Sequence, residues 1–157
     1  MSGSFSPQLF SAEKFLVVID RFPDLKFSAK AVKLPEVSSG SSNLSLPNTN
    51  VPIISDKINY GDLGISFLLE EDFVLFKALI EWITQAKDCE TFIQAQEAGL
   101  YSDISILLYS NKNNLIQTIN VTGCFPITIS LPELDTNKTG STTLDVTFEC
   151  TEFSFDC

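Results

Sequence analysis

The sequence contains no histidine, and this absence removes several classes of active site at once. Ser-His-Asp and Cys-His arrangements use an imidazole as the base, so neither can be assembled from this chain. The 4 cysteines include no C-x-x-C pair, and without histidine they cannot complete a mixed zinc site. The 7 glycines are scattered singly, which excludes a Gly-rich phosphate-binding loop. We therefore expect no catalytic residues, no metal and no cofactor.

Positive charge is scarce as well, because 10 basic residues, including the single arginine Arg21, stand against 20 acidic ones. The net charge is −10 at pH 7, and the lysines do not gather into a patch that could displace counterions from nucleic acid. Two explanations of the acidic balance stay open. It keeps the protein soluble, or it makes a surface that repels a polyanion.

No apolar run approaches the roughly 18 residues that a membrane-spanning helix needs, and the N-terminal residues have no basic and no long apolar segment. We therefore expect no membrane anchor and no signal peptide, and we expect reduced thiols in a cytoplasmic product. A hydrophobic fraction of 44% with 13 phenylalanines in 157 residues indicates one globular domain, residues 1–157, with one core.

One stretch predicts a helix, residues 72–87, DFVLFKALIEWITQAK. Its apolar residues recur at helical spacing and form one stripe: Phe73, Phe76, Leu79, Ile80, Trp82 and Ile83. Asp72 is the expected N-cap, and Glu70 and Glu71 place negative charge near the positive end of the helix dipole. A metal or acid/base role is the alternative interpretation of this acidic cluster.

The sequence before the helix favours strands. Residues 14–20 are apolar on both faces, which predicts a central strand covered from both sides. Residues 25–32 alternate between apolar and polar, and we expect them to pair with the first strand as a hairpin. Residues 53–59 and 63–69 predict two more strands that lead to the helix.

The sequence after the helix predicts a second hairpin, formed by residues 102–109 and 115–124. The segment GCFP is expected to stop the second of these strands, because proline cannot donate to a ladder. Residues 127–131 then pair briefly. Residues 142–155 predict a long last strand whose apolar phase switches near Cys150, which indicates a bulge or a strand that leaves the core.

Two segments show little sign of regular structure. Residues 1–13 are Ser-rich and predict a loose N-terminal arm. Residues 35–52, PEVSSGSSNLSLPNTNVP, form an insertion that is long for a compact domain, and such insertions tend to be functional or mobile. Two interpretations stay open: a floppy surface loop, or an arm that becomes ordered against a partner.

Strands with apolar residues on one face and Thr, Ser or Asn on the other are typical of a two-layer sheet protein. Exposed sheet edges are an aggregation hazard, and joining subunits edge to edge into a closed barrel removes it. Assembly is therefore one interpretation of these strands. A small acidic β-domain that binds a ligand is another, and it would be a stable monomer with an enclosed pocket and a perturbed carboxylate.

The order of these motifs resembles the tail tube proteins of contractile-tailed (myovirus-type) bacteriophages. The matching segments lie within residues 14–156 and are KFLVVID, LKFSAKAVKLP, KINYGDLGISFLLEEDF, VTGCFP and TLDVTFECTEFSF. The resemblance implies a mainly β fold, a two-sheet β-sandwich or half-barrel with one flanking helix, that assembles into hexameric rings. Stacked rings would form a hollow tube, a structural role without catalysis, in a virion tail assembled in the host cytoplasm.

The resemblance also implies contacts. The loop after the second strand, here residues 35–52, would reach the neighbouring ring, together with the N-terminal arm and residues 132–141. The contact residues implied within that loop are Pro35, Glu36, Val37, Ser38, Asn43, Leu44, Leu46, Asn48 and Val51. The partners implied are other copies of the chain, a sheath protein and a baseplate tube-initiator.

The lumen of such a tube conducts DNA without binding it specifically, and the acidic balance of this chain suits that role. The strand face that carries Lys26 and Lys30 fits a lumen poorly. Thr118, Asn120 and Thr122 are therefore favoured as the inner wall. A baseplate tube-initiator and a secretion-system or pyocin-like tube protein are alternative assignments.

Overall fold

The structure, a computed structural model, describes residues 13–23, 29–87, 89–91, 93–94, 99–131, 133–137 and 139–156. A mainly β fold is confirmed, and it contains one long helix among the described residues. The elements are β1 (Phe15–Ile19), β2 (Ala29–Lys33), β3 (Val37–Leu46), β4 (Thr49–Tyr60), β5 (Leu63–Leu68), α1 (Val74–Lys87), β6 (Ser102–Tyr109), β7 (Leu115–Ser130), β8 (Thr143–Glu149) and β9 (Glu152–Asp156). The predicted N-terminal arm, apart from residue 13, lies outside the described residues.

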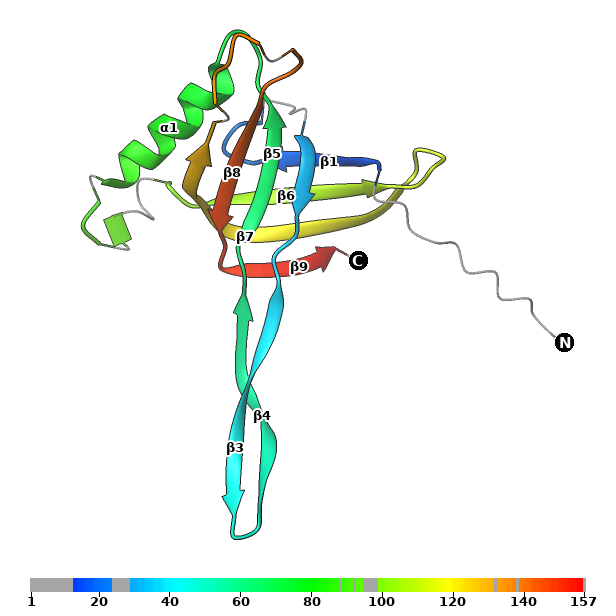
Figure 1. The fold of residues 1–157 in the computed structure, drawn as a ribbon, viewed down its shortest axis with the longest axis vertical. Helices are drawn as coiled ribbons and strands as arrows, with labels where there is room; N and C mark the ends of the chain where they lie inside the picture. Colours follow the sequence, from blue (N-terminus) through cyan, green and yellow to red (C-terminus); the bar gives the residue numbers. More distant parts are fainter. Residues whose placement is uncertain are drawn as a thin grey trace, which may run out of the picture.

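Two layers of sheet share the strand β7. The hydrogen-bonded order is β1-β6-β7-β8-β5-β2, and β9 pairs with β7 beside this path. The first half of β7 pairs with β6 and β9, whereas its second half pairs with β8. We name β1, β6, the first half of β7 and β9 layer A, and the second half of β7 with β8, β5 and β2 layer B. The strands of the two layers cross at a steep angle (Figure 1).

The strand β7 passes from one layer to the other at Gly123, whose φ of 64° lies in the left-handed region. The backbone N–H of Gly123 donates to Asp103 Oδ1 at 3.2 Å. A Cβ at this position would lie 2.9 Å from the Cβ of Thr151, so both the backbone angle and the space favour glycine. The prediction that GCFP stops this strand was wrong. The segment bends the strand, and Pro126 is accommodated next to a register shift, where a ladder donor is dispensable.

The strands β8 and β9 follow β7 around the same corner. Phe125 lies opposite Glu149 in layer B, and Thr122 lies opposite Glu152 in layer A. The register is therefore the same on both sides, and β8 with β9 acts as one partner strand that is interrupted at residues 150–151. The irregularity predicted near Cys150 is confirmed, and it is a strand leaving one layer for the other.

The strand β1 lies at an edge and not at the centre. Within the described residues it pairs with β6, and the prediction of a hairpin with residues 25–32 was also wrong, because β2 pairs with β5 at the far end of the path. Residues 25–28 are outside the described residues. Leu16 and Val18, which suggested coverage on both faces, are half-buried on the outer face of layer A. A register shift after Ala29 leaves Ala31 exposed.

The core fills the space between the layers, and α1 contributes Leu79 and Trp82 to it. The Trp82 indole packs edge-on against Phe22 and its N–H donates to the Leu100 carbonyl at 2.6 Å. The Arg21 guanidinium lies 5.2 Å from the indole centroid, which fixes the helix further. The buried core residues are Val17, Ile19, Leu63, Ile65, Phe67, Leu79, Trp82, Leu100, Ile104, Ile106, Ile119, Val121, Cys124, Leu144, Val146 and Phe148.

The helix begins two residues later than the sequence predicts. Phe73, with a φ of 57°, provides the carbonyl that accepts the first helical hydrogen bond, from Lys77, so Phe73 and not Asp72 is the N-cap. Asp72 Oδ1 accepts from the N–H of Val74 at 3.4 Å. The predicted apolar stripe is narrower in the structure, because Phe73 and Ile80 are exposed.

Gly123→Ala tests the corner. Gly99→Ala is the matched control, because Gly99 has a φ of 66° but a Cβ there meets nothing within 4 Å. The control should cost about 1–2 kcal/mol of unfolding free energy from its backbone angle alone. Gly123→Ala should cost about 1–3 kcal/mol more, because the methyl group also collides with Thr151. Urea unfolding measures both, and equal losses would contradict the role assigned to this corner.

Candidate assembly surfaces

The strands β3 and β4 form a two-stranded sheet that projects from the body, and we name residues 37–60 the arm (Figure 1). Lys33 lies opposite Gly64 in the body, and Val37 lies opposite Tyr60 in the arm. The N–H of Gly61 donates to the Glu36 carbonyl at 2.7 Å between these pairs. The arm is therefore the outer part of one long hairpin.

The prediction of a structureless loop at residues 35–52 was wrong. These residues form β3, a two-residue turn at Pro47-Asn48 and the beginning of β4. The strand predicted at residues 53–59 is confirmed as the rest of β4. Apolar and polar residues alternate along a strand when one face of that strand is buried. Most side chains of the arm are exposed, so its sequence shows this alternation only weakly.

The outer part of the arm has one apolar face and one face that is polar except for Pro52 and Ile54. Leu44 lies opposite Val51, while Leu46 and Ile53 lie opposite Thr49 and Ser42. Because side chains alternate along a strand, these four apolar residues share one face. Their exposed fractions are 49% for Leu44, 46% for Leu46, 41% for Val51 and 44% for Ile53, and we name them the arm's apolar face. The opposite face carries Ser41, Asn43, Ser45, Asn50, Pro52 and Ile54.

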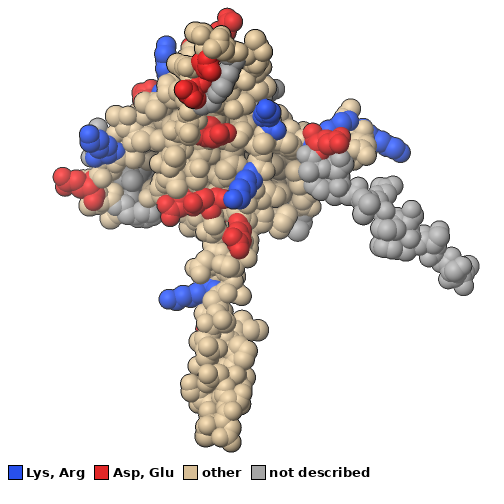
Figure 2. Space-filling view, in the orientation of Figure 1, with Lys and Arg blue, Asp and Glu red and all other residues tan. Residues whose placement is uncertain are grey.

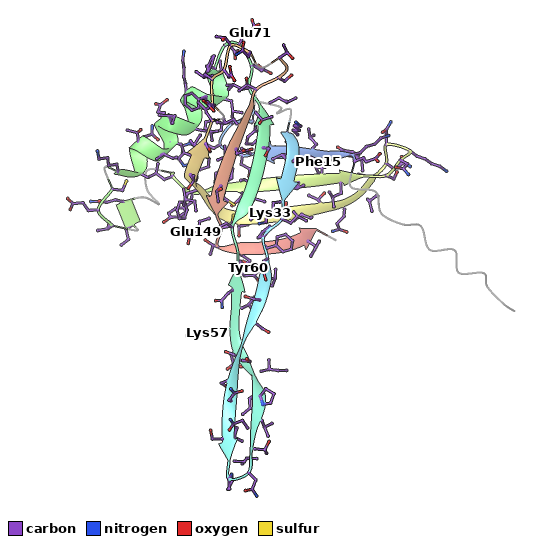
Figure 3. All side chains as sticks on the ribbon, in the orientation of Figure 1. Phe15, Lys33, Lys57, Tyr60, Glu71 and Glu149 are labelled. Atoms are coloured by element: carbon purple, nitrogen blue, oxygen red, sulfur yellow. The ribbon has the colours of Figure 1, made fainter. Side chains whose placement is uncertain are left out.

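The arm is nearly free of charge. Between residues 37 and 60 the charged residues are Asp56 and Lys57, whose charges cancel, in a chain with a net charge of −10. Figure 2 shows charged side chains over the body and almost none on the arm, and Lys57 is labelled there in Figure 3. An uncharged apolar surface of this kind suits contact with another copy of an acidic protein, because the contact adds no charge repulsion.

The predicted contact residues fall in different places. Val37, Leu44, Leu46 and Val51 are exposed on the arm, as a contact requires. Asn43 lies on the polar face, Asn48 lies in the turn, and Glu36 and Ser38 are exposed at the base. Pro35 is buried, and its contact with a neighbouring ring stays a prediction.

Sequence reasoning missed three exposed apolar side chains of β4, those of Ile53, Ile54 and Ile58. Ile54 is 86% exposed, the largest value among them. The sequence does contain a signal for Ile53, because the alternation in N-L-S-L before Pro47 is repeated in N-V-P-I after the turn. Two alternating segments around a Pro-Asn turn predict a hairpin with one apolar face.

The predicted inner-wall residues share the outer face of layer A, because Thr118, Asn120 and Thr122 alternate with the buried Ile119 and Val121. Asn120 lies between two serines of the neighbouring strands, Ser105 and Ser154. Its Oδ1 accepts a hydrogen bond from Ser105 Oγ at 3.1 Å. Short polar side chains therefore surround Asn120, while Leu107, Leu16 and Val18 continue the same face with apolar side chains toward β1.

The charge on this face is negative. Glu152 lies opposite Thr122 and therefore on the same face. Asp103 is exposed on β6 between the buried Ser102 and Ile104, which places it on this face as well. The four strands of layer A contain no lysine and no arginine within their bounds. Asp103 and Glu152 therefore give the described part of this face a negative charge that repels a polyanion.

The described part of the chain contains cavities of modest size. One of about 350 Å³ lies beside the end of α1, between Trp82, Leu100 and Phe125, and its walls are mostly apolar. Another, of about 310 Å³, is lined by polar and charged residues that include Asp20, Arg21 and Asp103. No group of three or more potential metal-binding side chains occurs among the described residues. No helix in that same set of residues has the length and apolar character to span a membrane.

The chain is similar in sequence and in fold to known proteins. No family model matches the chain. In sequence, the chain is 28% identical over 120 residues to the baseplate tail-tube junction protein gp54 of Enterobacteria phage T4, which covers 75% of this chain and 37% of that protein. The chain thus spans little more than a third of the length of that relative.

Solved structures with a similar fold include components of contractile particles. The sheath/tube terminator of the extracellular contractile injection system PVC has a TM-score of 0.74 at 15% identity, covering 96% of this chain and 99% of that one. The tube-terminating cap of the anti-feeding prophage gives 0.77 at 13% identity, covering 99% and 96%. Hcp1 from Flavobacterium johnsoniae gives 0.56 at 13% identity, covering 90% and 93%.

The sequence relative is a baseplate tail-tube junction protein, and the first two structures are a sheath/tube terminator and a tube-terminating cap. The chain therefore has the fold of the tube and tube-terminator proteins of contractile injection systems, and its sequence is similar to that of a myovirus tail-tube junction protein.

Proposed function

We propose that this chain is a tube subunit of a contractile-tailed bacteriophage, whose hexameric rings stack into a hollow tube that conducts viral DNA. The observation that carries the proposal is the arm, which holds an apolar face away from the body, where the described residues leave it exposed. An exposed face of this kind is stable in solution only as an interaction site.

The edges of layer A support closure into a ring. The strands β1 and β9 stand at opposite ends of this layer, and each has five residues. Each of the three ladders between them is antiparallel, so β1 and β9 run in opposite directions. The β9 edge of one copy can therefore pair with the β1 edge of the next copy and continue the antiparallel order. Repetition around a ring produces a closed barrel without free edges.

The outer face of layer A then lines the channel. Its threonines and asparagine form few strong contacts with a passing duplex, and Asp103 and Glu152 repel the phosphates at the same time. The acidic balance of the chain acquires a function in this arrangement. The partners follow from the proposal: other copies along the tube, a sheath protein around it and a tube-initiator at the baseplate, all in the virion tail after assembly in the host cytoplasm.

A position at the end of the tube is the second candidate. It is favoured by the similarity to a baseplate tail-tube junction protein and to tube terminators. The two candidates differ in self-assembly. A tube subunit forms rods of unlimited length at high concentration, whereas a terminator or junction protein forms single rings that bind one end of a tube.

Leu44→Asp tests the arm's apolar face, and Ser45→Asp is its matched control. Both variants add one negative charge, but Ser45 lies on the polar face. Leu44→Asp should raise the concentration needed for ring or tube formation roughly tenfold or more, because a leucine buried between copies contributes about 2 kcal/mol. Sedimentation and negative-stain electron microscopy measure this. Equal effects of the two variants would contradict the proposed contact, and a wild-type monomer at every concentration would favour the ligand-binding alternative.

A shortened arm separates assembly from folding. Replacing residues 40–57 by Asn-Gly joins Ser39 to Ile58, which already face each other in the ladder, through a turn that this dipeptide favours. The free energy of unfolding should change by less than about 1 kcal/mol, because the arm's side chains are exposed. Contacts between rings should be lost. If this variant unfolds like a core mutant, the arm belongs to the body's stability and not to assembly.

Thr118→Lys tests the inner wall, and Thr128→Lys in the layer B half of β7 is the control. Tubes of Thr118→Lys should assemble and retain short duplex DNA in pelleting assays at low salt, because each copy adds a positive charge to the channel. Tubes of the wild type and of the control should release it. Retention by the control alone would place the channel on the other layer.

A further inference from the structure

Two cysteines meet at the corner where β7 and its partner strand pass between the layers. Cys124 follows Gly123 in β7, and Cys150 comes directly after Glu149, the last residue of β8. Because the ladder has the same register on both sides of the corner, the two residues lie directly opposite each other. Their Sγ atoms are 3.0 Å apart.

This separation is about 1 Å longer than a disulfide bond of ~2.05 Å. Residues facing each other on neighbouring antiparallel strands also bring their Cβ atoms to about 4.5–5.5 Å or closer, near the range of disulfides. A small rotation of the side chains at a corner that already departs from regular strand geometry is enough to join the two sulfur atoms. Cys89, by contrast, lies at the end of α1 beside Gln85.

We propose that Cys124 and Cys150 form an oxidation site, which a peroxide converts into an intramolecular disulfide across the corner. The proposal does not depend on the function of the tube. It adds a covalent modification to a pair of thiols that stay reduced in a reducing compartment and become oxidised when the assembled particle meets an oxidising environment.

The reaction balances with hydrogen peroxide as the oxidant. The Cys150 thiolate attacks one peroxide oxygen, the O–O bond breaks, and the departing hydroxide takes a proton to form water. Cys124 Sγ then attacks the sulfur of the Cys150 sulfenic acid. The S–O bond breaks, the S–S bond forms, and the second hydroxide leaves as water with the proton of Cys124. Two thiols lose two electrons, which the peroxide accepts.

The environments of the two thiols fit this order. Cys124 is buried, whereas Cys150 is half-buried and accessible to a small oxidant. The hydrogen bond to Cys150, followed by burial, raises the pKa of the Cys124 thiol well above its usual value. Because Cys150 is the more accessible of the two thiols, it is the residue that reacts first.

The disulfide would link the bend of β7, at Cys124, covalently to the segment that connects β8 with β9, at Cys150. This crossing carries β9 into layer A, where its free edge is one of the two edges expected to pair between copies. The bond closes a loop between positions 26 residues apart, which restricts the unfolded chain. The melting temperature should rise by about 5–15 °C.

The experiment uses the full chain carrying Cys89→Ser and Cys157→Ser, so that Cys124 and Cys150 are the remaining thiols. The protein is treated with a small excess of hydrogen peroxide and then denatured and alkylated. We expect both thiols to become unreactive, a peptide cross-linked between positions 124 and 150 in the mass spectrum, and a higher melting temperature that dithiothreitol reverses. Cys150→Ala in the same background is the control and should show no shift.

The unsubstituted chain is mapped in parallel, so the result does not depend on how the variants fold. A linked 124–150 peptide in both proteins supports the proposal. Two alkylated thiols after treatment, a sulfinic acid at Cys150 without the cross-link, or disulfides between chains in place of it would each overturn it.

Discussion

The structure depends on one constraint, which is that a single strand serves both layers. The strand β7 pairs with β6 and β9 in layer A and with β8 in layer B, so it must bend sharply without losing its ladders. Gly123 provides the backbone angle, and the opposing strand yields at residues 150–151 to keep the register. The core closes around this corner, because Phe148 and Cys124 on either side of it are buried with Trp82 of the helix.

Two hairpins of this fold leave apolar side chains and strand edges exposed. The hairpin of β2 to β5 extends beyond the body as the arm, and the hairpin of β7 to β9 ends on a free edge of layer A. A monomer exposes both the arm's apolar face and the edges of β1 and β9. Exposed strand edges and apolar strips favour association. The proposed ring and its stacking would cover them with other copies, while the acidic outer face of layer A stays in contact with solvent.

Burial decided which parts of this fold could be predicted from the sequence. The alternation at Leu63, Ile65 and Phe67 predicted β5, because one face of that strand is fully buried. The same rule failed for residues 35–52, whose strands leave the body and bury little. It also failed for β1, where half-buried residues on the outer face imitated a central strand. Thr118, Asn120 and Thr122, which the sequence predicts as inner-wall residues, could be placed on one face. Ile53 and Ile58 of the arm were missed.

Cryo-electron microscopy of the purified chain at high concentration tests the central claim most directly. The account predicts closed rings in which the β9 edge of each copy continues into the β1 edge of the next as one antiparallel sheet, with layer A facing the channel. Single copies at all concentrations would contradict the account, as would rings joined through β2 or α1 with the edges of β1 and β9 left open.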